Sequence, residues 1–312
     1  MKKLLNDSFV QDALLRPEDM EDLDRTLYAS KKEDLIARQV LPLKEDVPDW
    51  AETHKFKKYY SEGSAKIAYH IGDDLPKTMV DDNDHSISII EIVHSYNIAK
   101  KRLAAAQAQG IPLEDTMVTE TRRAVEEKEN TVLFEGDSDA NLSGLCDYGS
   151  AVSLDNGDWV TGTSDAQKIH EDVKQMAVAL EKQDGNWNAR TLIVSNDAWE
   201  VMNTKYFTSS GPRRAAYDEI VDADLFDNIY KTSYLTTGGS AGNEMEVMVL
   251  DNSPENMAMV LPQDLDSLQP NDRGLYYEVP VWERIGEVLV RYDSSYSEDS
   301  VDAIKYANPT LT

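Results

Sequence analysis

The side chains that most often carry catalysis or bind metals are few and scattered in this sequence. The five histidines are His54, His70, His85, His94 and His170. None is paired with another at the spacing of a helical zinc site. The run DDNDH at 81–85 offers carboxylates, but it lacks the glycine and the distal glutamate of an EF-hand calcium loop. We therefore interpret it as an acidic, solvated turn and predict no metal site.

Candidate nucleophiles do not form a catalytic set either. Cys146 is the only cysteine, so the chain can form neither an internal disulfide nor a cysteine zinc site. Ser195 follows a predicted strand and is expected to belong to the cap of the next helix. The glycine-rich segment 236–242, TTGGSAG, lacks the spacing of a phosphate-binding loop. We predict no catalytic residue and no cofactor, and an α+β enzyme stays only as a distant alternative.

Acidic residues dominate the composition. The 58 Asp and Glu residues against 31 Lys and Arg residues give a formal net charge of −27. Such a surface repels nucleic acid over most of its extent. Strong salt would screen the self-repulsion, because the Debye length falls to about 3 Å at 1 M. A salt-adapted source and an ordinary acidic protein are both consistent with this composition.

Basic residues are densest in two short stretches of predicted helix. They are Lys100, Lys101, Arg102, Arg122, Arg123 and Lys128. Acidic residues are interleaved with them, which favours a salt-bridged helical face. The alternative is a weak basic patch on an inner face that contacts nucleic acid.

Residues 1–50 have the character of an arm. Leu35, Ile36 and Val40 could anchor a short helix, which Pro42 and Pro48 then end. The first residues, MKKLLNDSFVQDALL, are interrupted by polar side chains before an apolar signal-peptide core could form. No stretch approaches the roughly 18 apolar residues of a membrane span.

Residues 51–93 are predicted to form a long β-hairpin. The segments HKFKKYY, SAKIAYHI and SISIIEIV have the alternation of strands. The stem is basic, and the tip is expected to be acidic through Asp73, Asp74, Asp81, Asp82 and Asp84. Because an isolated two-stranded hairpin is marginally stable, we expect it to lie on a neighbouring subunit. Its acidic tip would then contact basic residues there.

A long charged helix follows a short helix that Gly110 ends. It begins near Pro112 and runs to about Phe134, roughly 20 residues or 30 Å. Its apolar positions, Met117, Ala124, Val125 and Val132, form a narrow stripe. Such a helix contacts its own fold along one seam. The helix stops at Gly136, and the chain resumes at Gly144-Leu145.

The remaining residues alternate between predicted helices and strands. A helix capped by Ser164 or Asp165 precedes the buried strand RTLIVS, and Asp197 with Glu200 resembles a capping box. Further predictions are a helix over 215–230, a strand–turn–strand over 244–262, and hairpins that turn at 155–157 and near 283–286.

The order of these parts resembles the Hong Kong 97-type (HK97-like) capsid fold of tailed-virus major capsid proteins, which encapsulin shells share. The resemblance rests on SAKIAYHIGDDLPKTMV, on the charged helix with its aromatic-x-Gly stop and following Gly-Leu, on TLIVSNDAWEVMN and on YYEVPVWERIGEVLVRYDS. It covers about residues 30–300. It implies an α+β fold with an N-terminal arm (1–50), an extended hairpin loop (51–93), a peripheral domain with a spine helix (94–160), an axial α/β domain (161–275) and closing strands that return to the peripheral domain (276–312).

The resemblance also implies a function. The chain would self-assemble, as hexamers and pentamers, into the icosahedral shell of a tailed double-stranded DNA virus. It would be part of the virion and assemble in the host cytoplasm. Scaffolding, portal and decoration proteins are the implied partners, with weak non-specific DNA contact and no membrane. An encapsulin-type shell around cargo enzymes is the alternative, and the acidic extended hairpin favours the virus.

Overall fold

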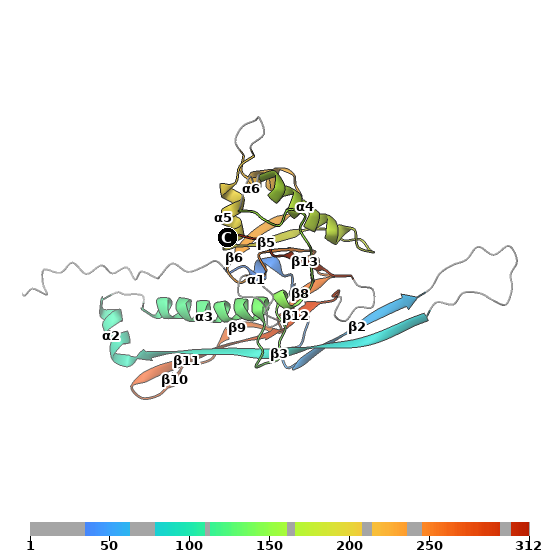
Figure 1. Ribbon diagram of the computed structural model, residues 1–312. Coiled ribbons are helices and arrows are strands. Elements are labelled where there is room, and N and C mark those ends of the chain that lie inside the picture. Colours follow the sequence, from blue (N-terminus) through green and yellow to red (C-terminus); the bar gives the residue numbers. More distant parts are fainter. Residues whose placement is uncertain are drawn as a thin grey trace, which may run out of the picture.

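Two layers of different shape make up the molecule, as Figure 1 shows. The computed structural model describes residues 35–62, 79–109, 113–160, 166–207, 214–235, 245–293 and 301–311. One layer, here called the long layer, consists of one long helix and a sheet of extended strands. The other, the compact unit, is a short-stranded sheet covered by three helices. A hairpin stem extends from the long layer beyond the other described elements.

The sheet of the long layer is built around one very long strand. Its order is β10 (Asn271–Asp272), β11 (Tyr276–Gly286), β3 (Met79–Ala99) and β2 (Thr53–Glu62), and β9 (Gln263–Ser267) also pairs with β11. Residues 79–88 of β3 pair with β2, whereas residues 89–99 pair with β11, both antiparallel. A single strand therefore belongs to the projecting hairpin in its first half and to the body in its second. The predicted hairpin is present, but its second strand begins at Met79, within the segment expected to be a turn, and the expected strand 86–93 pairs mostly with β11.

The long helix α3 (Leu113–Glu135) lies along this sheet, and the short α2 (Lys100–Gln109) precedes it. Val125 and Val132 are buried as predicted, with Thr121 one turn before them. Their spacing gives the expected narrow seam, because side chains three and four residues apart share one helix face. The seam also contains the buried polar residues Glu129 and Asn130, which the sequence did not predict.

Two glycines explain how α3 ends. Gly136 has a φ of +77°, a left-handed conformation that glycine adopts without steric cost. The chain then folds back through paired Asp137 and Leu142, whose backbone hydrogen bonds are 3.0 and 2.9 Å long. A Cβ on Gly144 would lie 2.3 Å from the Gly136 nitrogen and 2.4 Å from the Phe134 carbonyl oxygen. Only glycine fits there, and the short helix η3 (Leu145–Asp147) follows directly.

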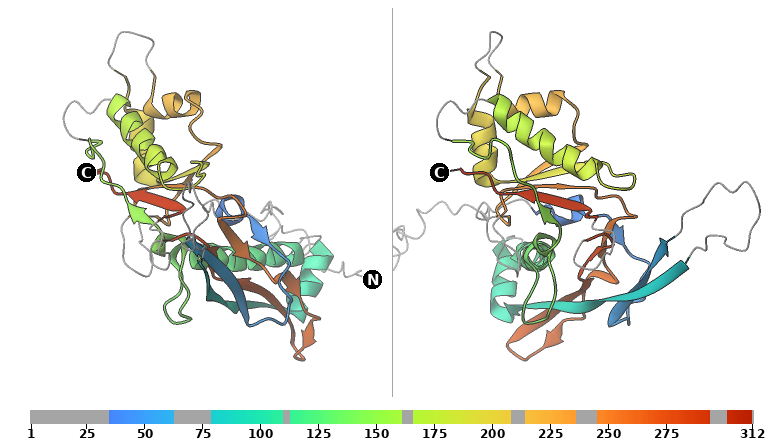
Figure 2. Two further views of the ribbon diagram at one scale, coloured as in Figure 1. Left: turned by 90° about the vertical axis from the view of Figure 1, so that its right-hand side faces the viewer. Right: turned by 45° about the vertical axis from the view of Figure 1, so that its right-hand side comes forward.

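The compact unit has a five-stranded sheet. Its order is β4 (Ser150–Ala151), β13 (Ile304–Ala307), β7 (Val247–Leu250), β5 (Thr191–Ser195) and β6 (Asn228–Thr232). The covering helices are α4 (Ala166–Glu181), α5 (Asn196–Thr204) and α6 (Ala216–Asp222). Figures 1 and 2 place them on the side of the sheet turned away from α3. Every residue of β5 and β7 is buried.

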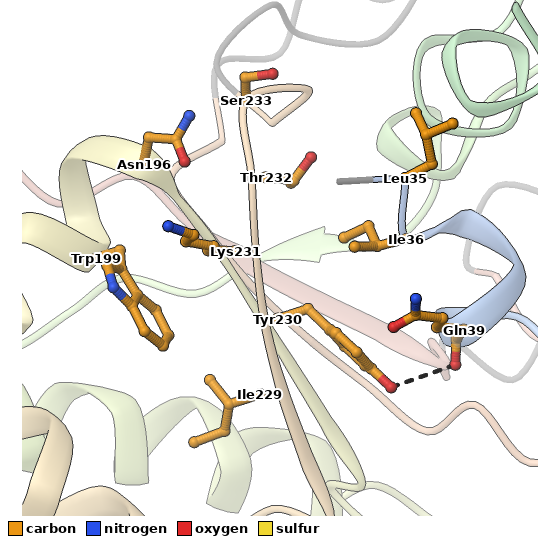
Figure 3. A pocket seen from close by; sticks show the side chains of 10 residues that line it. All are labelled: Leu35, Ile36, Gln39, Asn196, Trp199, Ile229, Tyr230, Lys231, Thr232 and Ser233. Carbon is orange, nitrogen blue, oxygen red and sulfur yellow. Dashed lines mark hydrogen bonds between the residues drawn. The ribbon is translucent and has the colours of Figure 1, made fainter. Parts of the chain in front are cut away.

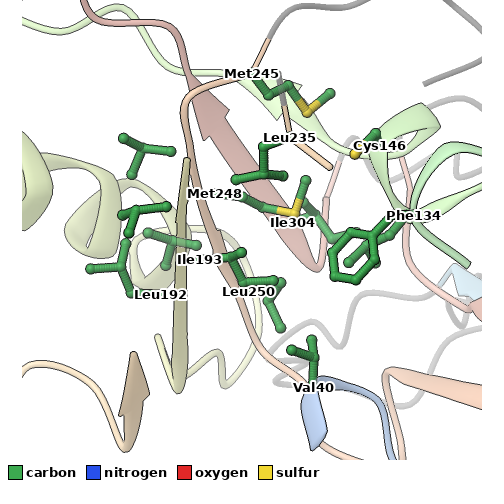
Figure 4. Packing of buried hydrophobic residues seen from close by; sticks show 14 of the residues in the cluster. Val40, Phe134, Cys146, Leu192, Ile193, Leu235, Met245, Met248, Leu250 and Ile304 are labelled. Atoms are coloured by element: carbon green, nitrogen blue, oxygen red, sulfur yellow. The ribbon is translucent and has the colours of Figure 1, made fainter. Parts of the chain in front are cut away.

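A third small sheet lies between the two layers. In it β8 (Met257–Val260) pairs in parallel with β1 (Leu43–Lys44) and antiparallel with β12 (Val288–Val290). The one-turn helix α1 (Ala37–Val40) precedes β1. The largest hydrophobic cluster runs from Val40 and Phe134 to the sheet residues Ile193 and Met248, as Figure 4 shows. The two layers therefore share one core.

Two of the predicted hairpins are wrong. The strand–turn–strand expected over 244–262 is present, with β7 and β8 lying in different sheets. However, β11 pairs with β3 while β12 pairs with β8, so residues 283–286 do not turn a hairpin. Near 155–157, β4 pairs with β13 instead of with a neighbouring segment. In each case a distant strand offers a buried partner, and local alternation does not identify it.

Other predictions need adjustment at element ends. The helix expected over 215–230 ends at Asp222, and residues 228–232 form strand β6 beside β5. The cap of α5 is Ser195, whose Oγ accepts a hydrogen bond from the Ala198 nitrogen at 3.0 Å, and not the predicted Asp197–Glu200 box. Of the closing strands, β13 joins the sheet of the compact unit, whereas β11 pairs with β3 in the long layer.

Candidate functional site: the projecting hairpin and the exposed sheet face

The candidate nucleophiles Cys146 and Ser195 have structural positions in this fold. Cys146 is fully buried, and burial raises the pKa of its thiol to about 12. A thiol in that state is not a nucleophile at neutral pH. Ser195 is equally buried and caps α5. Across the described residues, no three His, Cys, Asp or Glu side chains are placed to hold a metal ion, and no helix is both long and apolar enough to cross a membrane.

The hairpin stem is stabilised by contacts across its two strands. Phe56 and His85 stack with ring centroids 5.3 Å apart. Next to them, Lys57 Nζ lies 3.5 Å from an oxygen of Asp84, and both side chains are more than half exposed. Lys57 of β2 therefore has an acidic partner within the same hairpin, although the sequence analysis placed the basic stem far from the acidic residues.

The register also corrects the position of three predicted tip residues. Asp81, Asp82 and Asp84 lie on the stem strand β3, opposite Tyr60, Tyr59 and Lys57. Strand β3 begins at Met79, so all three aspartates lie within it. Asp73 and Asp74 fall outside the described residues. That these acids contact a neighbouring subunit stays a prediction.

The sheet face turned away from α3 carries exposed apolar side chains. Glu283 of β11 contacts Glu129 of α3, so the adjacent Trp282 points to the other face, because side chains alternate along a strand. Its cross-strand partner Val93 is 68 % exposed. A groove of about 520 Å³ is lined there by Val93, His94, Ser95, Leu268, Glu278, Pro280, Val281 and Trp282. Grouped exposed apolar side chains mark surfaces that bind other proteins.

The predicted basic patch is largely neutralised by ion pairs. The pairs are Lys100–Asp272 at 2.7 Å, Arg122–Glu126 and Arg123–Glu127 at 3.0 Å, and Lys128–Asp137 at 3.1 Å. Lys101 and Arg102 are exposed on α2. The arrangement favours the salt-bridged interpretation over a continuous surface for nucleic acid.

A buried charged cluster, which the sequence did not predict, joins α1, α3, β9 and β11. Arg38 donates to both carboxylate oxygens of Glu129, at 2.8 and 2.9 Å, and to Glu283. It also donates to Asp264 at 3.0 Å. Glu283 is fully buried, and the Glu129 side chain is 3 % exposed. The sequence signal for this cluster was a glutamate in the apolar seam, four residues after Val125.

A second groove, of about 680 Å³, lies between the start of the described chain and the edge of the compact unit. Figure 3 shows Leu35, Ile36 and Gln39 on one side and Trp199 with β6 on the other. The Tyr230 hydroxyl donates to the Gln39 carbonyl oxygen across it, at 3.5 Å. Residues 35–39 therefore lie beside strand β6, at the edge of the sheet, and line the groove together with it.

A comparison with known families decides what these surfaces belong to. The sequence profile of the major capsid protein family matches residues 63–298, most of the chain. The chain belongs to the major capsid protein family. This confirms the predicted function as a subunit of a capsid shell. No curated protein matches the sequence.

Solved structures show that this capsid protein has the expected fold. The capsid of the Myoviridae phage XM1 matches with a TM-score of 0.77 at 13 % identity, over 96 % of this chain and 100 % of that one. A structure from Mycobacterium phage Adephagia gives 0.67 at 14 % identity over 99 % of both chains. The capsid of a native GTA particle gives 0.68 at 13 % identity, over 98 % and 99 %. The predicted α+β, HK97-like fold is confirmed.

Proposed function

We propose that this capsid protein assembles with copies of itself, as hexamers and pentamers, into the icosahedral shell of a tailed double-stranded DNA virus. Its place is the virion, after assembly in the host cytoplasm, and its role is structural, not catalytic. The family match and the similarity to phage capsids along nearly the whole chain support this. The observation that carries the proposal is strand β3, which leaves the body to form a hairpin that none of the other described elements covers.

The geometry of the hairpin favours contact in trans. Two strands alone are marginally stable, and β2 lies at the edge of the sheet formed by the described strands, where a partner could pair with it. The hairpin projects from one end of the long layer, and α2 lies at the other end. A contact between unlike ends of identical subunits is heterologous, and it closes into a ring when the rotation fits. Hexamers and pentamers are rings of this kind.

The apolar sheet face is the surface that a neighbouring hairpin would cover. Val93 and Leu268 are 68 % and 50 % exposed, beside the groove lined by Trp282. Covering them would stabilise the contact by roughly 25 cal/mol for each Å² of apolar area removed from water. The acids Asp73 and Asp74 would then meet a basic residue of the neighbour, for which the exposed Lys101 and Arg102 are candidates.

Packaged DNA would contribute little to subunit binding. A net charge of −27 disfavours the binding of nucleic acid, and most of the clustered Lys and Arg side chains already have acidic partners. We therefore propose weak, non-specific DNA contact only. Scaffolding, portal and decoration proteins complete the set of proposed partners, since a shell that takes up DNA needs an entry vertex and a guide for its curvature.

The test is to remove the segment that joins the two hairpin strands. Glu62 and Met79 are paired in register, so an Asn-Gly turn can replace residues 63–78 without disturbing the stem. We expect the thermal unfolding of the subunit to stay unchanged, while electron microscopy and sedimentation show that closed shells are lost. Normal shells from this variant would contradict the proposed role of the hairpin.

A matched control separates chemistry from length. A Gly-Ser segment of the same length in place of residues 63–78 should also fail to assemble if side chains make the contact. For the wild-type particles, the ratio of absorbance at 260 and 280 nm distinguishes a DNA-filled virus capsid from a nanocompartment that holds cargo proteins.

A further inference from the structure

Trp50 lies in the connection between β1 and β2, and it is 80 % exposed. Among the described residues, no other aromatic side chain is as exposed. Trp159 and Trp187, by contrast, are buried in the core. Because a tryptophan offers about 150–250 Å² of surface for burial, leaving this one in water forfeits a large hydrophobic gain within the subunit.

The turn that carries Trp50 is anchored on both sides. The Ala51 nitrogen donates to the Pro48 carbonyl oxygen at 3.0 Å, which closes a four-residue turn with Trp50 at its third position. Val47 and Ala51 are buried in a small hydrophobic cluster with residues of β3, β8 and β12. The exposed ring therefore projects from a fixed backbone.

Arg284 of β11 holds the same turn from the side of the sheet. Its guanidinium donates to the carbonyl oxygens of Asp49 and Ala51, the two neighbours of Trp50, and the bond to Ala51 is 3.0 Å long. Its Nε lies 3.4 Å from a carboxylate oxygen of Glu91 on β3. Arg284 is buried, so water competes little for these bonds. The planar fork of an arginine can hold both carbonyl groups in fixed directions.

The turn lies on the sheet face that carries the other exposed apolar side chains. Trp282 and Arg284 are two residues apart on β11, so both point to the face turned away from α3. Across the ladder, Val93 is opposite Trp282 and Glu91 is opposite Arg284. The hold of Arg284 on the turn therefore places Trp50 on the same face as the groove lined by Val93 and Trp282.

The charged side chains around Trp50 are mostly acidic. Asp49 and Glu52 are exposed beside it, and Glu91 is more than half exposed on the adjoining strand. These carboxylates repel phosphate groups, which argues against packaged DNA as the cover of this ring. An aromatic anchor with a polar rim is instead the pattern of a contact between proteins.

We propose that Trp50 is an anchor that binds a second copy of this chain, and that Arg284 is the residue that positions it. A capsid protein meets many copies of itself, and Trp50 continues the face that the proposed function assigns to a neighbouring subunit. The inference therefore rests on the proposed shell function. A side chain that is held in place before binding loses little conformational entropy when it is covered, which favours association.

Truncating the anchor should weaken assembly without weakening the fold. Trp50→Ala removes an exposed side chain, so the thermal unfolding of the free subunit should stay close to that of the wild type. Loss of a central aromatic anchor weakens association by roughly 30-fold or more, and the protein concentration at which shells form should rise by about that factor. Trp50→Phe keeps an aromatic ring and should recover most of the loss.

Oxidative footprinting measures the contact directly in the wild-type chain. Hydroxyl radicals oxidise exposed indole rings, and mass spectrometry of peptides gives the extent of oxidation at each tryptophan. Trp50 should be oxidised in free subunits and protected in shells assembled from this chain alone. Trp159 is the internal control and should be protected in both states, because it is fully buried. A Trp50 that is already protected in the free subunit would overturn the proposal.

Arg284→Lys tests the positioning role. The lysine keeps a positive charge near Glu91 but cannot hold both carbonyl oxygens of the turn. In subunits that contain 5-fluorotryptophan, the fluorine signal of Trp50, assigned with Trp50→Phe, should become narrower because the ring moves more freely. The signal of Trp159 should not change, which a general loosening of the fold would not allow. An unchanged Trp50 signal would contradict the role of Arg284.

The outcomes separate the anchor from the shell function. A chain that forms no assembled state at any concentration would overturn the proposed function and the anchor together. Shells in which Trp50 is as reactive as in free subunits, or normal assembly of Trp50→Ala, would leave the shell function standing and overturn the anchor. The exposed ring would then be a surface for a different protein.

Discussion

The compact unit and the long layer differ in how far they bury their apolar side chains. In the compact unit, β5 and β7 are buried at every position, and α4 buries Ile169, Val173 and Met176 along one face. In the long layer, β3 is longer than any other strand, yet its Val93 is 68 % exposed. The two central strands of the compact unit are covered within one subunit. The long layer leaves apolar side chains exposed, and we propose that other copies cover them.

The largest expected effect separates subunit stability from assembly. Leu192→Ala in β5 removes a fully buried side chain and should lower the free energy of unfolding by about 2–5 kcal/mol. Val93→Ala in β3 should change it by less than about 0.5 kcal/mol, because the side chain is exposed. Denaturant unfolding of the subunit measures both values.

When particle yield is measured instead of subunit stability, Val93→Ala should have the larger effect of the two substitutions. At equal folded concentration, Val93→Ala should reduce the yield of particles in sedimentation, because it removes apolar area from the exposed face. If Val93→Ala destabilises the isolated subunit as much as Leu192→Ala does, the two regions do not differ in how they use their apolar surface.

A substitution in the connection after α3 is expected to have a smaller effect on the stability of the subunit. Gly144→Ala forces a methyl group onto the backbone atoms of Phe134 and Gly136, and should destabilise the subunit by about 3 kcal/mol. Gly157→Ala is the control. Gly157 has a φ of +53°, and the nearest atom would lie 3.8 Å from an added methyl group, so left-handed strain alone should cost about 1 kcal/mol. Equal melting temperatures for the two variants would disprove the steric role of Gly144.

The smallest expected effect concerns salt and the contacts between subunits. Each subunit has a net charge of −27, so like charges approach one another in the shell. Reducing NaCl from 1 M to 0.1 M lengthens the screening distance from about 3 to about 10 Å, and particles should then melt at a lower temperature. Calorimetry across a salt series measures this. A melting temperature that rises as salt is removed would instead indicate paired charges at the interfaces, and would count against a salt-adapted source.

Local patterns in the sequence predicted the elements better than their partners. The seam of α3, the stem of the hairpin and the capping role of Ser195 depend on neighbouring residues, and all are present. The placement of 247–250 and 257–260 in different sheets depends on β13 and β1, which lie far away in the chain. Both segments are buried on both faces, so alternation gives no information about the strands beside them.

The charged cluster illustrates the same limit at the level of single residues. Glu129 alone is an ordinary helical glutamate, and Glu283 alone is one of many acids. Their unusual environment arises only when α1, α3 and β11 come together around Arg38. Assembly, in turn, was predicted from the order of parts that resembles a capsid protein. No single motif in the sequence predicts assembly by itself.

The position of β13 has a consequence for synthesis on the ribosome. This strand lies between β4 and β7 in the sheet, although it is translated long after either of them. Until residues 304–307 leave the exit tunnel, a nascent chain exposes the bare edge of β7 and cannot complete the compact unit. Domains whose parts are contiguous can fold during translation, whereas this one must wait for a late strand. A shell subunit built in this way cannot complete its compact unit until residues 304–307 have emerged.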